Sequence, residues 1–487
     1  MHKLTQGRRR MWPWILAAVL LAWVAMGTWQ RVKPLPEGVS RALPERAVDG
    51  EVRFLTDETW YSPAGERHMR RQIFDEMLAL IGQARRVVVL DMFLFNDFAG
   101  ASDERDFRPL STELTEALVE QRRRYPQLEA VVITDPLNTL YGGLALAHFQ
   151  TLREAGVRVV TTDLNRLRAS NPLWSGLWHL GPRWLGNDRD AGWLPNALGP
   201  GRVTLRSYLA LLNFNANHRK TLVVDHGESW AGLVTTANPH DASSLHGNVA
   251  LRFAGPAALD LLDSERPLAR WSGVGLPGPA PPAPRPVPAE QARLQVLTEG
   301  AIRTALLAAI EASAPGGQLD VTVFYLSHRA VIDALLAAHA RGVAVRVLLD
   351  PNRAAFGLDK GGIPNRPVAE ELVEAGIDVR WCVTRGEQCH SKLLLRRPRD
   401  PAGEAEMLLG SANFTRRNLD DLNLETNVRL AGGIETPALL DAAAFFERRW
   451  HNSPRRITSE PYAALGDVGV WTHLRYRIME ASGLSTF

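Results

Sequence analysis

The chain has 487 residues, of which 45% are hydrophobic and 22% are charged, and its formal net charge is +3. This length and composition exclude a disordered chain and a small disulfide-stapled protein, because two or three domains can each bury a core. The net charge is too small to indicate a nucleic-acid partner by electrostatics. The two cysteines, Cys382 and Cys389, could form one clip in an oxidising compartment, and two buried thiols are an equal alternative.

The first distinctive segment is an apolar run at residues 11–29, close to the roughly 20 residues that cross a bilayer as a helix. Three arginines at 8–10 precede it, and only Arg31 and Lys33 follow closely, so the positive-inside rule places residues 1–10 in the cytoplasm. We therefore expect a single-pass anchor in the inner (cell) membrane, with everything beyond it on the periplasmic or outer side. A signal peptide cleaved after Gly27 is the alternative.

A Pro-rich spacer at 276–290 divides the rest of the chain into two halves, expected as lobe 1 at 51–275 and lobe 2 at 291–456. A juxtamembrane segment at 30–50 precedes lobe 1. A C-terminal tail at 457–487, to which the sequence assigns no function, follows lobe 2.

The two halves repeat the same segments in the same order. RVVVLDMFLF matches LDVTVFYL, VVITDPLN matches VRVLLDPN, and LREAGVRVV matches LVEAGIDVR. The first two pairs are typical of buried strands, the second ending in an Asp-Pro turn, and the third is a helix end, a glycine and a strand. We expect an α/β fold of two similar lobes, each a largely parallel or mixed β-sheet flanked by helices.

Late in each half a histidine and a lysine open an apolar strand. His218 and Lys220 stand in HRKTLVVD, and His390 and Lys392 stand in HSKLLL. Side chains two residues apart share one face of a strand, so each pair points the same way. One such pair alone is more often an ordinary surface pair, but two in matched repeats indicate a site.

Each half then supplies a hydroxyl and an amide two residues apart. Thr236 and Asn238 stand in TTAN, and Ser411 and Asn413 stand in GSAN. Lysine is rare here, since only five of the 56 basic residues are lysine and two of the five occupy the His-x-Lys positions. A compact ammonium suits a non-bridging phosphate oxygen near an attacking imidazole better than a planar guanidinium does.

These motifs resemble the phospholipase D superfamily. HRKTLVVD fits its HxKxxxxD motif, and HSKLLL followed by GSANFTRRNL and NLETNV resembles the second copy, so the likeness covers most of the chain after residue 50. The resemblance implies that both motifs meet at one site between the lobes. One histidine would attack phosphorus to form a phosphohistidine and the other would protonate the leaving alcohol, with no metal or cofactor.

The chemistry of the residues agrees with this, because a neutral imidazole can be the nucleophile and an imidazolium the acid. Lysines, hydroxyls and amides would hold the developing charge. We expect Glu425, in NLETNV, to orient His390 and favour its protonated form. His390 would then be the acid and His218 the nucleophile.

Three further residues are expected to support this site. His246, in LHGNVAL, stands at the place that matches Glu425, with Asp241 nearby, so lobe 1 supplies no assured carboxylate. Asp225 follows His218 by seven residues, an odd offset that turns it away from the catalytic face, so we expect a structural role. Arg397 replaces this aspartate in the second motif, which affects packing before chemistry.

Lobe 1 also carries an insertion of about 48 residues, expected at about 165–210, because 62 positions separate Gly156 from His218 and 14 separate Gly376 from His390. Its tryptophans suit either the bilayer interface or a lid that packs on the lobe. They are Trp174, Trp178, Trp184 and Trp193.

The anchor and this insertion favour phospholipids and the membrane as partners, and resemblance to bacterial cardiolipin synthases implies transfer of a phosphatidyl group, or hydrolysis with water as acceptor. A metal-independent nuclease is one alternative, but it would need a basic, aromatic-lined groove and no Lys/Arg block outside the N-terminus stands out. A catalytically degenerate, membrane-bound lipid-binding scaffold is the other. The sequence predicts no oligomeric state.

Overall fold

The computed structural model describes residues 3–48, 50–98, 107–196, 199–352, 354–355, 358–359, 361–466 and 468–482. The side chains of residues 3–10, 354–355 and 358–359 are not described. Residues 1–2 of the expected cytoplasmic segment and the last five residues of the expected tail therefore lie outside the described residues.

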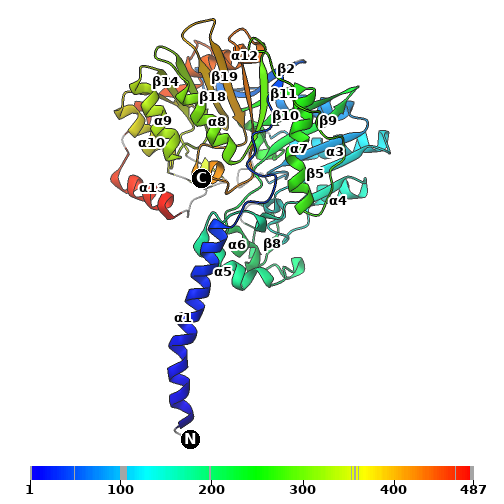
Figure 1. Cartoon of the computed structure of the whole chain (residues 1–487), viewed down its shortest axis with the longest axis vertical. Coiled ribbons are helices and arrows are strands. Elements are labelled where there is room, and N and C mark those ends of the chain that lie inside the picture. The colour runs from blue at the N-terminus through cyan, green and yellow to red at the C-terminus, as the bar shows by residue number, and fades with distance from the viewer. Residues whose placement is uncertain are drawn as a thin grey trace.

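Two large mixed sheets form the body of the molecule (Figure 1). The first has the order β3-β2-β11-β10-β9-β4-β5-β6, and the second has the order β1-β12-β20-β19-β18-β13-β14-β17-β21. The strands of the first are β2 (Val52–Tyr61), β3 (Arg67–Arg70), β4 (Val87–Met92), β5 (Glu129–Thr134), β6 (Arg158–Thr161), β9 (Lys220–His226), β10 (Ser229–Thr235) and β11 (Asn248–Ala254). Those of the second are β1 (Arg46–Ala47), β12 (Arg293–Thr298), β13 (Gln318–Val323), β14 (Ala344–Leu349), β17 (Asp378–Cys382), β18 (Lys392–Arg397), β19 (Glu404–Gly410), β20 (Thr426–Gly433) and β21 (Ser459–Pro461).

The two sheets repeat one topology, since β2, β11, β10, β9, β4, β5 and β6 lie in the same order as β12, β20, β19, β18, β13, β14 and β17. The expected fold of two similar α/β lobes with mixed sheets is confirmed. Among the described strands of the two sheets, β4-β5-β6 and β13-β14-β17 pair in parallel and the other strand pairs are antiparallel. The reason is that β9 to β11 and β18 to β20 follow one another directly, whereas parallel neighbours need a long crossover.

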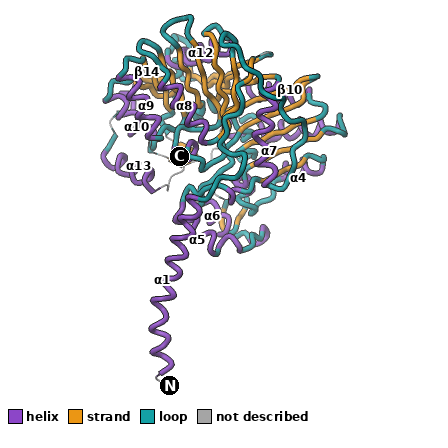
Figure 2. The backbone as a smooth tube through the Cα atoms, viewed as in Figure 1, coloured by secondary structure: helices purple, strands orange, loops and turns teal. Residues whose placement is uncertain are grey.

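Helices lie against the sheets (Figure 2), and apolar side chains of helices and sheets are buried together. One hydrophobic cluster combines residues of both sheets, such as Val223 of β9 and Met407 of β19, with residues of α7 and α12. A shared core of this kind holds the lobes as one body and fixes the two His-x-Lys strands relative to each other. The helices of lobe 1 are α2 (Ile73–Gln83), α3 (Leu110–Arg124), α4 (Ala147–Glu154) and α7 (Pro256–Trp271), and those of lobe 2 are α8 (Gly300–Glu311), α9 (Arg329–Ala340), α10 (Asn365–Glu374), α11 (Arg416–Leu419) and α12 (Pro437–Trp450).

The N-terminal helix α1 (Lys3–Val32) projects from the body (Figure 1). Its stretch Met11–Val32 is long and apolar enough to cross a membrane, and only 6% of that window is buried inside the protein. The following segment enters lobe 2 first, because Ala42 bridges Leu297 and β1 pairs with β12.

The C-terminal segment is also built into the body. Ile457 bridges Tyr61 of lobe 1, and β21 then pairs with β17 of lobe 2. Helix α13 (Val470–Ser482) follows and contributes Tyr476 to the core of lobe 2. The segment from Ile457 to the last described residue therefore touches both lobes.

The insertion folds as short elements beside the C-terminal end of α1 (Figure 1). Trp178 is buried and Trp174 is half-buried, whereas Trp184 is 72% exposed and Trp193 is 61% exposed. Two indoles thus pack inward, as expected for a lid on the lobe, and two face outward, where the expectation of a bilayer interface stays a prediction. The elements of the insertion are α5 (Pro172–Leu180), β7 (Leu194–Pro195), β8 (Arg202–Val203), α6 (Leu205–Leu211) and short 3-10 turns between them.

Candidate active site

The segment that enters each His-x-Lys strand is held by a buried aspartate that follows the strand two places away in the same sheet. Asp135 follows β5 and its Oδ2 accepts the N–H of Asn217 at 2.7 Å, and Asp350 follows β14 and its Oδ2 accepts the N–H of Cys389 at 2.7 Å. Burial raises the pKa of Asp135 to about 7 and that of Asp350 to about 6. The sequence marked both only as Asp-Pro turns, and their repetition was the signal for a role at the site.

The two lobes exchange backbone hydrogen bonds at the histidines. The N–H of His218 donates to the carbonyl of Leu424 at 2.9 Å, and the N–H of His390 donates to the carbonyl of Gly247 at 2.8 Å. The segment that enters β20 therefore lies against the motif of lobe 1, and the segment that enters β11 lies against the motif of lobe 2. Each lobe presents its next side chain to the histidine of the other.

The side chain presented to His218 is Glu425. Its Oε2 lies 3.0 Å from Nδ1 of His218, and Ser411 and Asn418 also donate to the fully buried carboxylate. Burial lowers the pKa of His218 to about 4, against the opposing effect of Glu425. The expectation that Glu425 orients His390 is wrong, because the exchange between the lobes directs it to the opposite histidine.

His390 instead meets Asn248, whose Oδ1 lies 3.1 Å from its Nδ1 and also accepts from Thr236 at 2.9 Å. Asn248 thus occupies the place in lobe 1 that Glu425 occupies in lobe 2. The assignment of that place to His246 is wrong, since His246 lies two residues earlier with its ring centroid 6.0 Å from that of His390. Burial, together with the charges of Lys392 and His246, lowers the pKa of His390 well below its ordinary value.

Asp241 contacts neither histidine in the structure. Its carboxylate accepts the N–H and the hydroxyl of Ser111, at 3.0 and 2.8 Å, at the start of α3. Lobe 1 therefore presents an amide, that of Asn248, to His390, and Asp241 does not act as its carboxylate partner.

Both lysines are fully buried beside their histidines. Nζ of Lys220 donates to the carbonyl of His218 at 2.6 Å, and Nζ of Lys392 donates to that of His390 at 2.8 Å. Burial lowers the pKa of Lys220 to about 7 and that of Lys392 well below its ordinary value. An anion bound between them would favour their charged forms.

Two phenylalanines complete the pairs, and the sequence analysis missed them. Phe93 lies 4.8 Å from the ring of His218 and 5.0 Å from Nζ of Lys220, and Phe324 lies 5.2 Å from the ring of His390 and 5.4 Å from Nζ of Lys392. Both follow the matched strands in MFLF and VFYL, which was the available signal. The rings wall each histidine on one side.

The two amides differ. Oδ1 of Asn238 accepts the N–H of Leu94 at 3.2 Å, whereas Oδ1 of Asn413 is buried with no hydrogen-bond partner among the residues that the structure describes. Asn413 therefore has a buried oxygen that could still accept a hydrogen bond.

Asp225 and Arg397 stand seven residues after His218 and His390, and both make structural contacts away from the histidines. Asp225 accepts the N–H groups of Arg86 at 2.8 Å and Val87 at 2.7 Å, which fixes the start of β4. Arg397, in the matching place, pairs with Asp320 at 2.8 Å and with Glu447 at 3.0 Å. Each lobe thus closes the far end of its catalytic strand by a different interaction.

Arg219, the residue between His218 and Lys220, is a buried link between the lobes that the sequence did not indicate. It pairs with Glu265 at 3.0 Å and with Glu299 at 2.6 Å. Oε1 of Glu299 also accepts the N–H of Glu425 at 3.1 Å. The network connects the backbone of the His218 motif to the residue that contacts His218.

The two halves share one electrostatic environment. The pKa of His390 is lowered in part by Lys220 and His218, and that of His218 in part by Lys392. Two imidazoles with Nδ1 engaged, facing two ammonium groups, can bind and attack a phosphodiester anion. Among the described residues no group of three or more His, Cys, Asp or Glu side chains could hold a metal ion.

Comparison with known proteins identifies a matching domain and similar folds. Residues 306–450 match the family model described as "Cardiolipin synthase, PLD-like domain". The search of curated protein sequences found no match. Among solved structures, phosphatidylserine synthase from Haemophilus influenzae Rd KW20 superimposes with a TM-score of 0.56 at 11% identity, over 91% of this chain and 96% of that one. The phospholipase D family member Nuc from Salmonella typhimurium has 20% identity over 34% of this chain and 97% of its own, with a TM-score of 0.27.

The fold of the chain is therefore similar to that of phosphatidylserine synthase, and residues 306–450 are similar to a PLD-like domain. The second lobe carries the PLD-like domain of the cardiolipin synthase type.

Proposed function

We propose that this protein is a membrane-anchored phosphodiesterase that acts on phospholipids through a phosphohistidine, by phosphatidyl transfer or by hydrolysis. The observation that carries the proposal is the pair of His-x-Lys motifs, each with Nδ1 of its histidine engaged by the opposite lobe. A hydrogen bond at Nδ1 leaves Nε2 as the reactive nitrogen of each ring. Two such rings supply the nucleophile and the acid that a two-step phosphoryl transfer needs.

His218 is the nucleophile in this proposal, for a reason other than the one the sequence offered. When Nε2 of His218 bonds to phosphorus, its imidazole becomes a cation, and the carboxylate of Glu425 at Nδ1 stabilises that charge. The bond from phosphorus to the leaving alkoxide breaks as the new bond forms. Lys220 and Lys392 hold the non-bridging oxygens, which carry the negative charge.

His390 is the acid and then the base. Its Nε2 gives a proton to the leaving alkoxide, and its neutral amide partner and nearby lysines make this proton easy to release. An acceptor alcohol, or water, then gives its proton to the same nitrogen as its oxygen attacks phosphorus. The bond to His218 breaks and both rings return to their starting state.

Three observations support a phospholipid as the substrate and the membrane as its location. The matched domain is of the cardiolipin synthase type, a long apolar helix precedes the body, and part of the insertion exposes large apolar side chains. The disulfide between Cys382 and Cys389 favours an oxidising compartment, and the N-terminal arginines favour a cytoplasmic N-terminus. Together these support lobes on the periplasmic or outer side of the inner membrane.

The test is to incubate the full-length protein, purified in nanodiscs and with EDTA present, with labelled phosphatidylglycerol and separately with single-stranded DNA. The matched variants are His218→Ala, His390→Ala and, as a control outside the site, His226→Ala. We expect lipid turnover that both active-site variants lose and the control keeps, and products with and without added alcohol separate transfer from hydrolysis. Cleavage of DNA without lipid turnover would replace the proposal by a nuclease.

A further inference from the structure

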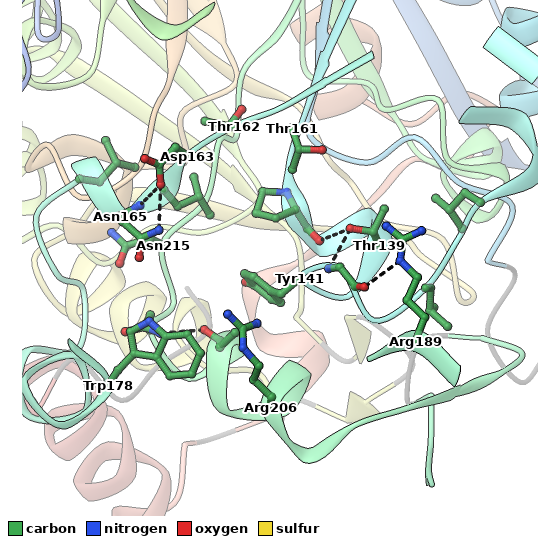
Figure 3. A pocket seen from close by; sticks show the side chains of 18 of the residues that line it. Thr139, Tyr141, Thr161, Thr162, Asp163, Asn165, Trp178, Arg189, Arg206 and Asn215 are labelled. Carbon is green, nitrogen blue, oxygen red and sulfur yellow. Dashed lines mark hydrogen bonds between the residues drawn. The ribbon is translucent and has the colours of Figure 1, made fainter. Parts of the chain in front are cut away.

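A cavity of about 540 Å³ lies beside the catalytic site, where the end of α1 meets the insertion (Figure 3). Gln30 of α1 lines it together with Tyr141, Trp178, Arg189 and Arg206. Asn215, three residues before His218, also lines it, so the cavity borders the loop that carries the first motif. Figure 3 shows Arg206 reaching from α6 towards Trp178 and Tyr141, with Arg189 near Thr139.

The position of this cavity relative to the bilayer follows from how α5 packs on α1. Nε1 of Trp23 donates to the carbonyl of Leu173 at 2.7 Å, and a Cβ on Gly176 would lie only 2.9 Å from the backbone nitrogen of Gly27. Trp23 and Gly27 stand about 10 and 5 Å along the helix axis from Gln30, at 1.5 Å per residue. If α1 crosses the bilayer, α5 lies at the depth of an interfacial helix and the cavity at the level of the headgroups.

The outward side chains of the insertion fit that depth. Leu173, Leu177 and Leu180 stand at i, i+4 and i+7 of α5 and are 68%, 44% and 40% exposed. Trp184 and Leu185 follow and are also exposed, and we call these five residues the apolar face of the insertion. The opposite side of α5, with Ser175 and Trp178, lines the cavity. One short helix therefore separates an apolar exterior from a cavity that contains polar and charged side chains as well as apolar ones.

The cavity is positively charged. Arg189 donates to the carbonyl of Gly142 at 3.1 Å and Arg206 to that of Leu185 at 2.5 Å, and neither forms an ion pair with a carboxylate among the described residues. A guanidinium has five N–H donors in a fork that suits phosphate, so both keep charge and donors for an anion. Asp163 is a carboxylate in the same lining, but it caps Asn165 and pairs with Arg166 at 3.7 Å.

We propose that this cavity binds the phosphate headgroup of an anionic phospholipid whose acyl chains lie along the apolar face of the insertion and α1. The inference rests on the membrane anchoring proposed above and is independent of catalysis. The bilayer is the occupant of the apolar face because that face continues directly from an apolar helix of membrane-spanning length. The site would hold a lipid at the edge of the catalytic loop.

The first experiment measures the depth of the apolar face. Leu177→Cys and the control Leu440→Cys, which is exposed on α12, are labelled with a fluorophore in nanodiscs containing lipids with a quencher on the acyl chain. The two native cysteines are joined in a disulfide and do not compete for the label under non-reducing conditions. We expect strong quenching at position 177 and none at 440. Equal quenching at both positions would overturn the membrane contact.

The second experiment measures the headgroup site. Binding of dioleoyl-phosphatidylglycerol is followed by native mass spectrometry in a His218→Ala background, so that turnover does not intervene. Arg189→Gln with Arg206→Gln should weaken binding by about tenfold or more, as expected for losing charge-assisted hydrogen bonds. Arg202→Gln, on the same insertion and outside the cavity lining, is the matched control and should leave binding unchanged.

Two further measurements distinguish the causes of a change in lipid binding. Arg206→Lys keeps the charge and should retain most of the affinity, which separates loss of charge from loss of the bonds that Arg206 makes to the insertion. Inorganic phosphate at equal concentration should not displace the lipid. Unchanged lipid binding in the double variant, or displacement by free phosphate, would overturn the proposal while leaving the proposed catalysis untouched.

Discussion

The two halves of the proposed active site have the same scaffold but different chemical partners. Each histidine precedes a matched strand, follows a residue whose N–H is held by a matched aspartate, and lies beside a matched phenylalanine. The partner at Nδ1 differs, since His218 has the carboxylate of Glu425 and His390 has the amide of Asn248. The fold gives the two histidines equivalent positions, but Glu425 and Asn248 give them different hydrogen-bond partners. This difference allows the two imidazoles to have different roles in the proposed reaction.

The largest effect is expected from removing either ring, and the leaving group distinguishes them. His218→Ala should reduce turnover of any phosphodiester by at least about 10³-fold because no covalent intermediate forms. His390→Ala should lose about 10²- to 10⁴-fold on a natural lipid, the usual range for a general acid. With a nitrophenyl ester, which needs no acid to leave, His390→Ala should still form the phosphohistidine adduct. An adduct formed by His218→Ala instead would reverse the roles.

The next prediction sharpens the difference between the two partners. In Asn248→Asp, a carboxylate at Nδ1 of His390 should raise the pKa of this histidine, because it favours the charged imidazolium. The acid must be protonated, so activity is lost as the pH rises through this pKa, and the high-pH limb of kcat/KM should move to higher pH. Movement of the low-pH limb instead would mark His390 as the nucleophile.

A smaller effect, on stability rather than chemistry, is expected at the far ends of the two catalytic strands. Asp225→Ala leaves buried backbone N–H groups unsatisfied and should lower the free energy of unfolding by about 3 kcal/mol. Arg397→Ala removes a partly exposed ion pair and should cost about 1 kcal/mol or less. Thermal unfolding of the two variants measures this, and equal losses would contradict the asymmetry.

The smallest effect on activity is expected for a disulfide that is present in lobe 2 alone among the described residues. The Cys382–Cys389 disulfide closes a short loop directly before His390, and lobe 1 has no equivalent bond. Its removal by Cys382→Ser with Cys389→Ser should lower stability by about 2 to 3 kcal/mol through the unfolded chain. Activity at a permissive temperature should be nearly unchanged, because Asp350 still holds the N–H at residue 389. A loss of activity without a loss of stability would show that the disulfide positions His390.

The sequence by itself determined the repeat, the two mixed α/β lobes, the apolar helix and the His-x-Lys pairs. These depend on local periodicity, turn residues and unusual lysines, all of which are visible in a short window. The structural positions of Asp225 and Arg397 follow from the same alternation along a strand.

Only the tertiary structure decided which acceptor meets which histidine. Comparison of the sequences NLETNV and LHGNVAL paired Glu425 with His246 and predicted that Glu425 contacts the histidine of its own lobe. In the structure, backbone hydrogen bonds at Leu424 and Gly247 place Glu425 and Asn248 each beside the histidine of the opposite lobe. The burial of Arg219 with Glu265 and Glu299 was equally invisible. The physical reason is that these contacts join residues up to about 200 positions apart, whose meeting depends on how two complete lobes pack.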